Sequence, residues 1–139
     1  MDIKIIENGV SSEVFINLRR TTQFKTYGKE DVKEALKHTL YSVAIKDEDQ
    51  YIGMARIVGD GRIAFFIKDV VVIPKYQHKH IGELIMKKLF EYIEKHACHD
   101  AYIGLMSTPN KEGFYKRFGF IERPTKDFGS GMVKFYEKR

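Results

Sequence analysis

The chain has 139 residues, a length that suits one domain with a core of its own. Hydrophobic residues make up 43% of it and aromatic residues 13%, which excludes an intrinsically disordered protein. It carries 24 Lys and Arg against 19 Asp and Glu, a net charge of +5 that suits an anionic partner. The basic residues are scattered among acidic ones, so we expect no nucleic-acid binding.

No apolar run reaches the roughly 20 residues of a membrane span. The N-terminal residues alternate like a strand and lack the apolar region of a signal peptide. We therefore expect a soluble, cytoplasmic protein that binds no membrane. The single Cys98 excludes an internal disulfide and any cysteine-based metal cluster.

The first half of the chain alternates strand and helix patterns. Ser11 or Ser12 is predicted to cap a helix that turns Phe15 inward and exposes Arg19. A second amphipathic helix follows Gly28, and an acidic turn joins two strands as a hairpin. We predict strands over Asp2–Ile6, Leu40–Ile45, Tyr51–Val58 and Arg62–Val72, and the second helix over Glu30–His38.

The second half places helices between further strands. We predict a helix from about His80 to His96, a fifth strand over Ala101–Met106, a short helix over Lys111–Phe118 ended by Gly119, and strands over Phe120–Ile121 and Met132–Tyr136. The expected fold is α/β (α+β): one domain over residues 1–139, with a central mixed, mostly antiparallel sheet of six to seven strands and about four helices. The fourth strand, the long helix and the fifth strand form a βαβ unit.

The segment from Val70 to Gly82 indicates an anion-binding site. An apolar, β-branched run ends at Pro74, which cannot donate to a sheet ladder. A short basic loop follows, and a helix begins near Ile81. A strand, a basic turn and a helix aim unpaired backbone N–H groups and a helix dipole at an anion. We therefore expect a phosphate-bearing ligand at the start of this helix.

Two motifs then carry a family resemblance. Residues 69–82 resemble the Gln/Arg-x-x-Gly-x-Gly/Ala signature of the GCN5-related N-acetyltransferase (GNAT) family, which follows a strand ending in proline. Residues 113–120, Gly-Phe-Tyr-Lys-Arg-Phe-Gly-Phe, resemble its second signature. Order and spacing are those of the family, and the resemblance covers essentially the whole chain. Asp69–Val72, Tyr76-Gln77 and Gly131-Met132 look most like the arylalkylamine (serotonin-type) acetyltransferases of plants and bacteria.

The resemblance implies acetyl-CoA as co-substrate. The amides of residues 77–82 would wrap the pyrophosphate, with His78 and Lys79 as side-chain donors. The acetyl-pantetheine arm would pair beside the fourth strand, which diverges from the fifth, and a backbone N–H of Val71 or Val72 would polarise the thioester carbonyl. The residues implied for cofactor binding are Val70, Val71, Val72, Gln77, His78, Lys79, His80, Ile81, Gly82, Asn110 and Tyr115.

His80 departs from the family pattern, because it stands where the family usually has its first glycine. A positive φ at this position would cost a histidine roughly 1 kcal/mol. His78 and His80 form a His-x-His pair, but no third ligand is near them in the sequence, so we expect no metal.

Tyr115 is the candidate catalytic acid that the resemblance implies. A phenol beside the sulfur can protonate the departing thiolate. Asp69 is the candidate base, with a buried or edge carboxylate paired with a lysine as the alternative. Glu13 and Glu112 are weaker candidates, more easily explained as charges on helix surfaces.

We therefore expect an acyltransferase that moves an acetyl group from acetyl-CoA to a primary amine of a small molecule, an arylalkylamine or a polyamine, by direct attack in a ternary complex. Phe24, Tyr27, Phe65 and Phe66 would favour an acceptor with an apolar body. The alternatives are a protein or peptide N-acetyltransferase and a non-catalytic acyl-CoA-binding regulatory module. A homodimer is common in such folds.

Overall fold

The computed structural model describes all 139 residues. It divides into two compact units, Met1–Leu105 and Met106–Arg139, which are described separately below. The single domain expected over residues 1–139 stays a prediction.

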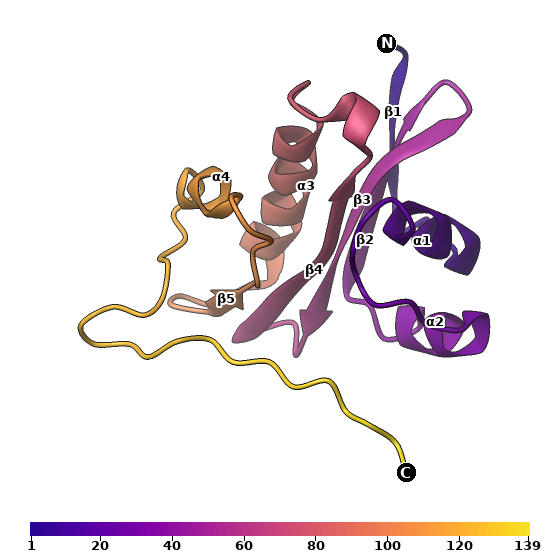
Figure 1. Ribbon diagram of the computed structural model, residues 1–139. Coiled ribbons are helices and arrows are strands. Elements are labelled where there is room, and N and C mark those ends of the chain that lie inside the picture. Colours follow the sequence, from indigo (N-terminus) through magenta and orange to yellow (C-terminus); the bar gives the residue numbers. More distant parts are fainter. The chain divides into compact units, whose positions relative to one another are not determined.

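The first unit is built on a five-stranded sheet in the order β1-β2-β3-β4-β5 (Figure 1). Its strands are β1 (Ile3–Glu7), β2 (Tyr41–Asp47), β3 (Gln50–Gly59), β4 (Ala64–Val72) and β5 (Tyr102–Gly104). Neighbouring strands are antiparallel except β4 and β5, which are parallel. The mixed, mostly antiparallel sheet and the βαβ unit are therefore confirmed.

Helices cover both faces of this sheet. They are α1 (Ser12–Arg19), α2 (Lys29–Leu36) and α3 (Ile81–His96), and a single turn of 3-10 helix, η1 (Pro74–Tyr76), precedes α3. The helix α3 packs on one face, against β2, β3 and β4, and α1 packs on the other face, with α2 beside it (Figure 1). No helix of the protein is both long and apolar enough to span a membrane.

Local sequence explains where α1 and α3 begin and which side they bury. The Ser11 hydroxyl accepts a hydrogen bond from the backbone N–H of Val14 at 3.2 Å, which confirms the predicted cap. Along α3, apolar residues at helical spacing form its buried side: Ile81, Ile85, Met86, Leu89 and Ile93. Burying each of these side chains contributes about 1.5–3 kcal/mol.

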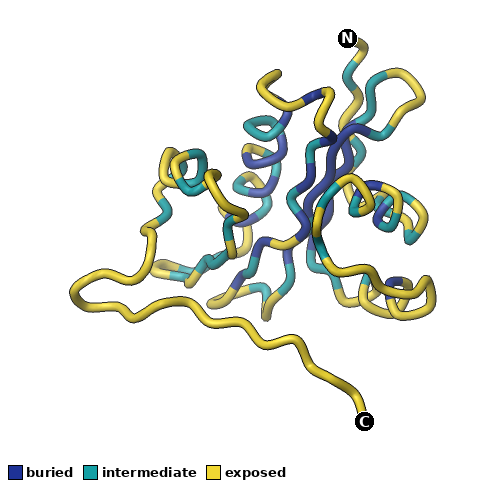
Figure 2. The backbone as a smooth tube through the Cα atoms, in the orientation of Figure 1, coloured by how far each residue is buried: buried dark blue, intermediate teal, exposed yellow.

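The core lies where α3 meets the middle of the sheet (Figure 2). Val43, Ile45, Ile52 and Ile57 are fully buried on β2 and β3. Phe65 of β4 is 1% exposed, so this ring belongs to the core and cannot contact an acceptor. The expectation that Phe65 lines an acceptor site is therefore wrong.

The strand count differs from the prediction. The sheet has five strands instead of six or seven, because Phe120–Ile121 and Met132–Tyr136 form no strand. Both segments have the composition of strands, but a strand also needs a neighbour that pairs with its backbone N–H and C=O groups.

The second unit contains one short helix, α4 (Glu112–Lys116). This helix ends at Lys116 with Arg117 as its C-cap, earlier than the predicted end at Phe118, and Gly119 follows in the turn with a left-handed φ of 92°. The residues from 121 to 139 are exposed and take no regular secondary structure. Three of the large apolar side chains there are Met132, Val133 and Tyr136, which are 89%, 62% and 81% exposed.

Candidate active site

One side of β4 lacks a strand partner over most of its length. The strand pairs with β3 from Phe65 to Val72, with one irregularity, but with β5 only where Ala64–Phe66 meets Tyr102–Gly104. Beyond Phe66 the parallel pairing stops. We call the stretch Ile67–Val72, on the side that faces away from β3, the open edge of β4. This pairing ends where β5 itself ends, at Gly104, and the predicted divergence of the fourth and fifth strands stays a prediction.

Hydrogen-bond alternation fixes which peptide groups face the open edge. The N–H of Ile73 donates to the carbonyl of Ile52 in β3 at 2.9 Å. Neighbouring residues of an antiparallel strand point their peptide groups to opposite sides, so the N–H and C=O of Val72 point away from β3. Those of Val71 point toward β3, where Val71 is opposite Met54. Between the two valines considered, Val72 is the one with an N–H at the open edge.

A β-bulge interrupts β4 just before these valines. Val71 is opposite Met54 and Lys68 is opposite Arg56, so Asp69 and Val70 together face Ala55 alone. Asp69 takes a left-handed φ of 59°. A bulge of this kind bends the strand and increases its local twist.

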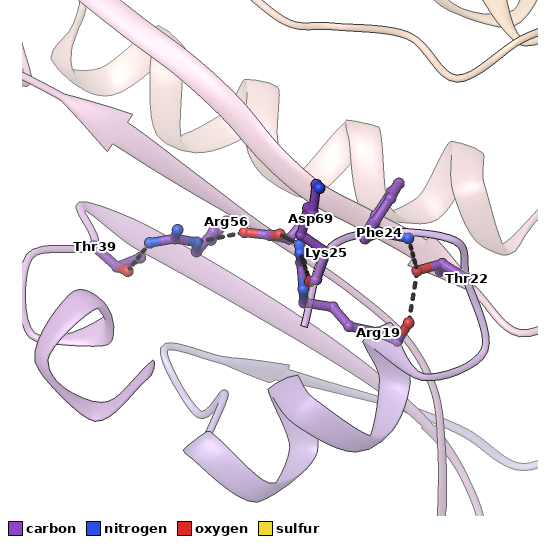
Figure 3. Close-up of polar contacts among 7 residues, drawn as sticks. All are labelled: Arg19, Thr22, Phe24, Lys25, Thr39, Arg56 and Asp69. Carbon is purple, nitrogen blue, oxygen red and sulfur yellow. Dashed lines mark hydrogen bonds and ion pairs between the residues drawn. The ribbon is translucent and has the colours of Figure 1, made fainter. Parts of the chain in front are cut away.

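The carboxylate of Asp69 is buried between two arginines (Figure 3). Its side chain is 2% exposed. One oxygen accepts from Arg56 Nε of β3 at 2.6 Å, and the other accepts from Arg19 Nη1 of α1. Each oxygen thus already has a cationic donor, and protonation would weaken both contacts. The geometry favours the alternative reading of Asp69 as a paired, buried carboxylate, with arginines in place of the expected lysine. Its role as base stays an untested prediction that this arrangement does not support.

Arg19 and Arg56 are the residues that the sequence analysis missed. Arg19 was expected at the surface, but its side chain is only 11% exposed, so that expectation is wrong. Arg56 is 13% exposed and also donates to the Thr39 hydroxyl at 3.2 Å. An arginine in the middle of the otherwise apolar run of β3 was the one available signal, because a buried charge requires a partner.

The predicted anion site forms a tight turn before α3. His78 and His80 both have positive φ, 62° and 65°, and His80 is the N-cap residue of α3 without a side-chain cap of its own. The side chains of residues 77–80 are exposed. The Gln77 side chain reaches back and donates to the Val72 carbonyl at 3.1 Å. The structure therefore brings the turn directly next to the open edge of β4.

A buried tyrosine fastens this turn to the β2–β3 hairpin. The Tyr76 hydroxyl donates to Asp47 Oδ2 at 2.5 Å, and Asp47 Oδ1 accepts from the backbone N–H of Asp2 at 2.8 Å. The hydrogen bond from Tyr76, followed by that from Asp2, lowers the pKa of Asp47. Lys79 Nζ lies 5.5 Å from the centre of the Tyr76 ring, which places its charge at the turn.

Tyr115 and Asn110 belong to the second unit. Tyr115 lies on α4 within a small aromatic cluster, with its ring centre 5.1 Å from that of Phe114 and 6.2 Å from that of Phe120. Burial raises the pKa of the Tyr115 phenol above its ordinary value. Asn110 is exposed, with a φ of 70°. The chain contains no group of three or more side chains that could hold a metal ion.

The fold and these motifs define a class of α/β protein in which an open strand edge leads into a tight basic turn at the start of a helix. The acetyltransferase (GNAT) domain family matches residues 7–138. The chain belongs to this family.

Known proteins of the same family resemble the chain over most of its length. It is 35% identical over 111 residues to GCN5-related N-acetyltransferase 1, chloroplastic, of Arabidopsis thaliana, covering 78% of this chain and 54% of that protein. It is 29% identical to serotonin N-acetyltransferase 2, chloroplastic, of Oryza sativa subsp. japonica, covering 96% and 64%. The chain thus spans between half and two thirds of the length of these two relatives.

A solved structure shares the fold closely. A protein of unknown function from methicillin-resistant Staphylococcus aureus, described as a probable acetyltransferase, superimposes with a TM-score of 0.87 at 30% identity. The match covers 96% of this chain and 99% of that one. The resemblance inferred from the two motifs is therefore confirmed.

Proposed function

We propose that this chain is an N-acetyltransferase that moves the acetyl group of acetyl-CoA to a primary amine of a small molecule. One observation carries the proposal: the open edge of β4 leads directly into the left-handed basic turn at the start of α3. The first feature offers peptide groups to an extended arm that contains amides, and the second offers backbone N–H groups and a positive charge to phosphates. Coenzyme A has both parts.

The proposed reaction is a direct transfer. The neutral amine nitrogen attacks the thioester carbonyl carbon, a C–N bond forms, the C–S bond breaks, and the thiolate leaves. The N–H of Val72 donates to the carbonyl oxygen as negative charge develops there, since it faces the open edge. The nitrogen loses its proton to solvent, because both oxygens of Asp69 already accept from arginines.

Tyr115 is the proposed acid for the departing sulfur. Its phenol gives its proton to the thiolate and takes one back from solvent. Since burial raises the pKa of this phenol, its O–H is present throughout the neutral pH range. The support for this role is the position of Tyr115 in the family motif together with its protonation state.

An arylalkylamine or a polyamine is the proposed acceptor. The support is the named serotonin N-acetyltransferase among the relatives and the aromatic residues Phe24 and Tyr27, whose rings surround the guanidinium of Arg19 at 5.0 and 5.4 Å. Such rings suit an acceptor with an apolar body or an ammonium group.

We also propose a homodimer as the assembled form. The exposed apolar side chains of Met132, Val133 and Tyr136, in a segment with the sequence pattern of a strand, support a second copy as the partner that covers them.

Release of the free CoA thiol from acetyl-CoA, measured with a panel of amines, tests the function. The panel contains arylalkylamines, polyamines, a lysine-containing peptide and peptides with free N-termini. Turnover with small amines is expected. Turnover with the peptides alone would favour the protein N-acetyltransferase. Tight acetyl-CoA binding without turnover on any amine would favour the regulatory module.

A further inference from the structure

We infer that the Arg19–Asp69–Arg56 cluster positions the transfer step, by holding the bulge of β4 so that the Val72 N–H faces the acetyl-CoA carbonyl. The inference rests on the proposed function and adds two arginines to it. None of the three residues is assigned a proton-transfer role.

The backbone of Asp69 needs external support. It is a non-glycine residue in the left-handed conformation, which side chains disfavour, and its carboxylate is almost fully buried. A buried carboxylate is tolerated only when it is paired and fully hydrogen-bonded. Arg19 donates to one oxygen and Arg56 to the other. If the carboxylate rotated or moved away, at least one buried guanidinium would lose its anionic partner.

The three partners come from three separate elements. Arg19 is on α1, Arg56 is on β3 and Asp69 is on β4, as Figure 3 shows. Arg56 is opposite Lys68, the residue directly before the bulge, so its side chain crosses to the bulge from the adjacent register position. The Thr39 hydroxyl accepts a hydrogen bond from Nη1 of the same guanidinium. The bulge is therefore tied to α1 and to β3, and Val72 follows it in the same strand.

Arg19 also reaches the loop between α1 and α2. Its Nη2 donates to the carbonyl of Lys25 at 2.5 Å, and its backbone carbonyl accepts from the Thr22 hydroxyl at 2.6 Å. The Thr22 hydroxyl in turn accepts from the backbone N–H of Phe24 at 3.0 Å. One guanidinium thus joins the loop that carries Phe24 and Tyr27 to the bulge of the strand that carries Val72. Arg19 therefore contacts both the loop proposed to bind the acceptor and the strand proposed to bind acetyl-CoA.

The test compares acetyl-CoA bound to the wild type and to four variants. Asp69→Asn keeps the shape and removes the charge. Arg56→Met removes one pair, and Arg56→Lys keeps a cation with poorer geometry. Arg20→Met is the control for the loss of an arginine, because Arg20 is the exposed C-cap residue of α1. The readout is the stretching frequency of the ¹³C-labelled thioester carbonyl by infrared difference spectroscopy, together with the Kd for acetyl-CoA and kcat with an acceptor that turns over.

In the wild type we expect a carbonyl band shifted to lower frequency, since a hydrogen bond weakens the C=O bond. Asp69→Asn and Arg56→Met should lose most of this frequency shift, and their kcat should fall at least about tenfold. The Kd for acetyl-CoA should change much less. Arg56→Lys should fall between them and the wild type, and Arg20→Met should match the wild type. The kcat of a positioning variant should fall by the same factor at every pH.

An unchanged band and kcat in folded Asp69→Asn or Arg56→Met would overturn the inference. A loss of the acid limb of the pH profile in Asp69→Asn would overturn it too, because that result would make Asp69 the base. If Asp69→Asn does not fold, the two Arg56 variants decide. A wild type that does not bind acetyl-CoA would instead overturn the proposed function.

Discussion

Tyr76 hydrogen-bonds Asp47 across the end of the β2–β3 hairpin, with its hydroxyl 2.5 Å from Asp47 Oδ2. This contact holds the turn that precedes α3, because Tyr76 is the last residue of η1 and the turn begins at Gln77. The proposed phosphate site therefore depends on Asp47, the last residue of β2 in the β2–β3 hairpin.

Tyr76→Phe should weaken acetyl-CoA binding without impairing chemistry. Removing the hydroxyl frees the turn but leaves the aromatic ring in place, so KM for acetyl-CoA should rise several-fold while kcat changes little. Steady-state kinetics with saturating acceptor measures both. Tyr51→Phe is the control, because Tyr51 lies on the same hairpin and no hydrogen bond of its hydroxyl connects to the turn. A drop in kcat with unchanged KM would contradict the assignment.

The same pair predicts how stability depends on pH. The hydrogen bond from Tyr76 lowers the pKa of Asp47 below its ordinary value of 3.8. A carboxyl whose pKa is lower in the folded state contributes stability above its ordinary pKa, and loses it as the pH falls through the folded value. The free energy of unfolding of the wild type should therefore exceed that of Tyr76→Phe near neutral pH, and the gap should narrow at acid pH. Denaturant unfolding at a series of pH values measures it; a gap that is constant down to the acid end would show that Asp47 is not the partner that titrates.

Tyr115→Phe should lower kcat by about a hundredfold and leave the Kd for acetyl-CoA nearly unchanged. The phenyl ring keeps its packing in the aromatic cluster, so only the proton donor is lost. Because burial raises the pKa of this phenol, no basic limb from Tyr115 should appear between neutral pH and its ordinary value of 10. Tyr136→Phe, an exposed phenol in the same unit, is the control. Equal kcat for Tyr115→Phe and the wild type would end the general-acid assignment.

His80→Gly should make the protein more stable. The left-handed φ of 65° costs a side chain roughly 1 kcal/mol, which glycine avoids, although glycine also gains freedom in the unfolded chain. Acetyl-CoA should bind at least as tightly, because the backbone N–H groups of the turn remain. Lys79→Gly is the comparison: its φ is not positive, so the substitution should destabilise. A several-fold weaker Kd in His80→Gly would show that the imidazole itself contacts the ligand.

The exposed apolar residues of the last segment predict self-association. Replacing Met132 and Tyr136 by glutamate should convert a dimer to a monomer, since like charges and lost apolar contact both oppose pairing. Light scattering after size-exclusion chromatography measures the mass of both proteins. A monomeric wild type at micromolar concentration would contradict the dimer.

The sequence predicts elements whose signal is local. The helix α3 has apolar residues at regular spacing, β4 has a β-branched run closed by Pro74, and the hairpin β2–β3 has an acidic turn. All three form close to where the pattern places them. The turn at residues 77–82 is predictable as well, because the motif carries it.

What the sequence could not predict depends on contacts between distant residues. Nothing local marks Asp69 for a left-handed bulge, since its two arginines lie 50 and 13 residues away. Arg19 follows a typical amphipathic pattern and would be solvated if no carboxylate lay beneath it. The segment Met132–Tyr136 has the composition of a strand but forms none, because composition alone does not determine backbone pairing.

The pairing of Ala64–Phe66 with β5 sets a length limit beside β4. A linear molecule that lies along the strand from Val72 can run no further than Ile67, a track of roughly 17 Å at about 3.3 Å per residue. Past that point the groups it would use already bind β5. For the arm of acetyl-CoA proposed to lie there, β5 would mark the end of the available edge, so the length of the arm as well as its chemistry would decide how it fits.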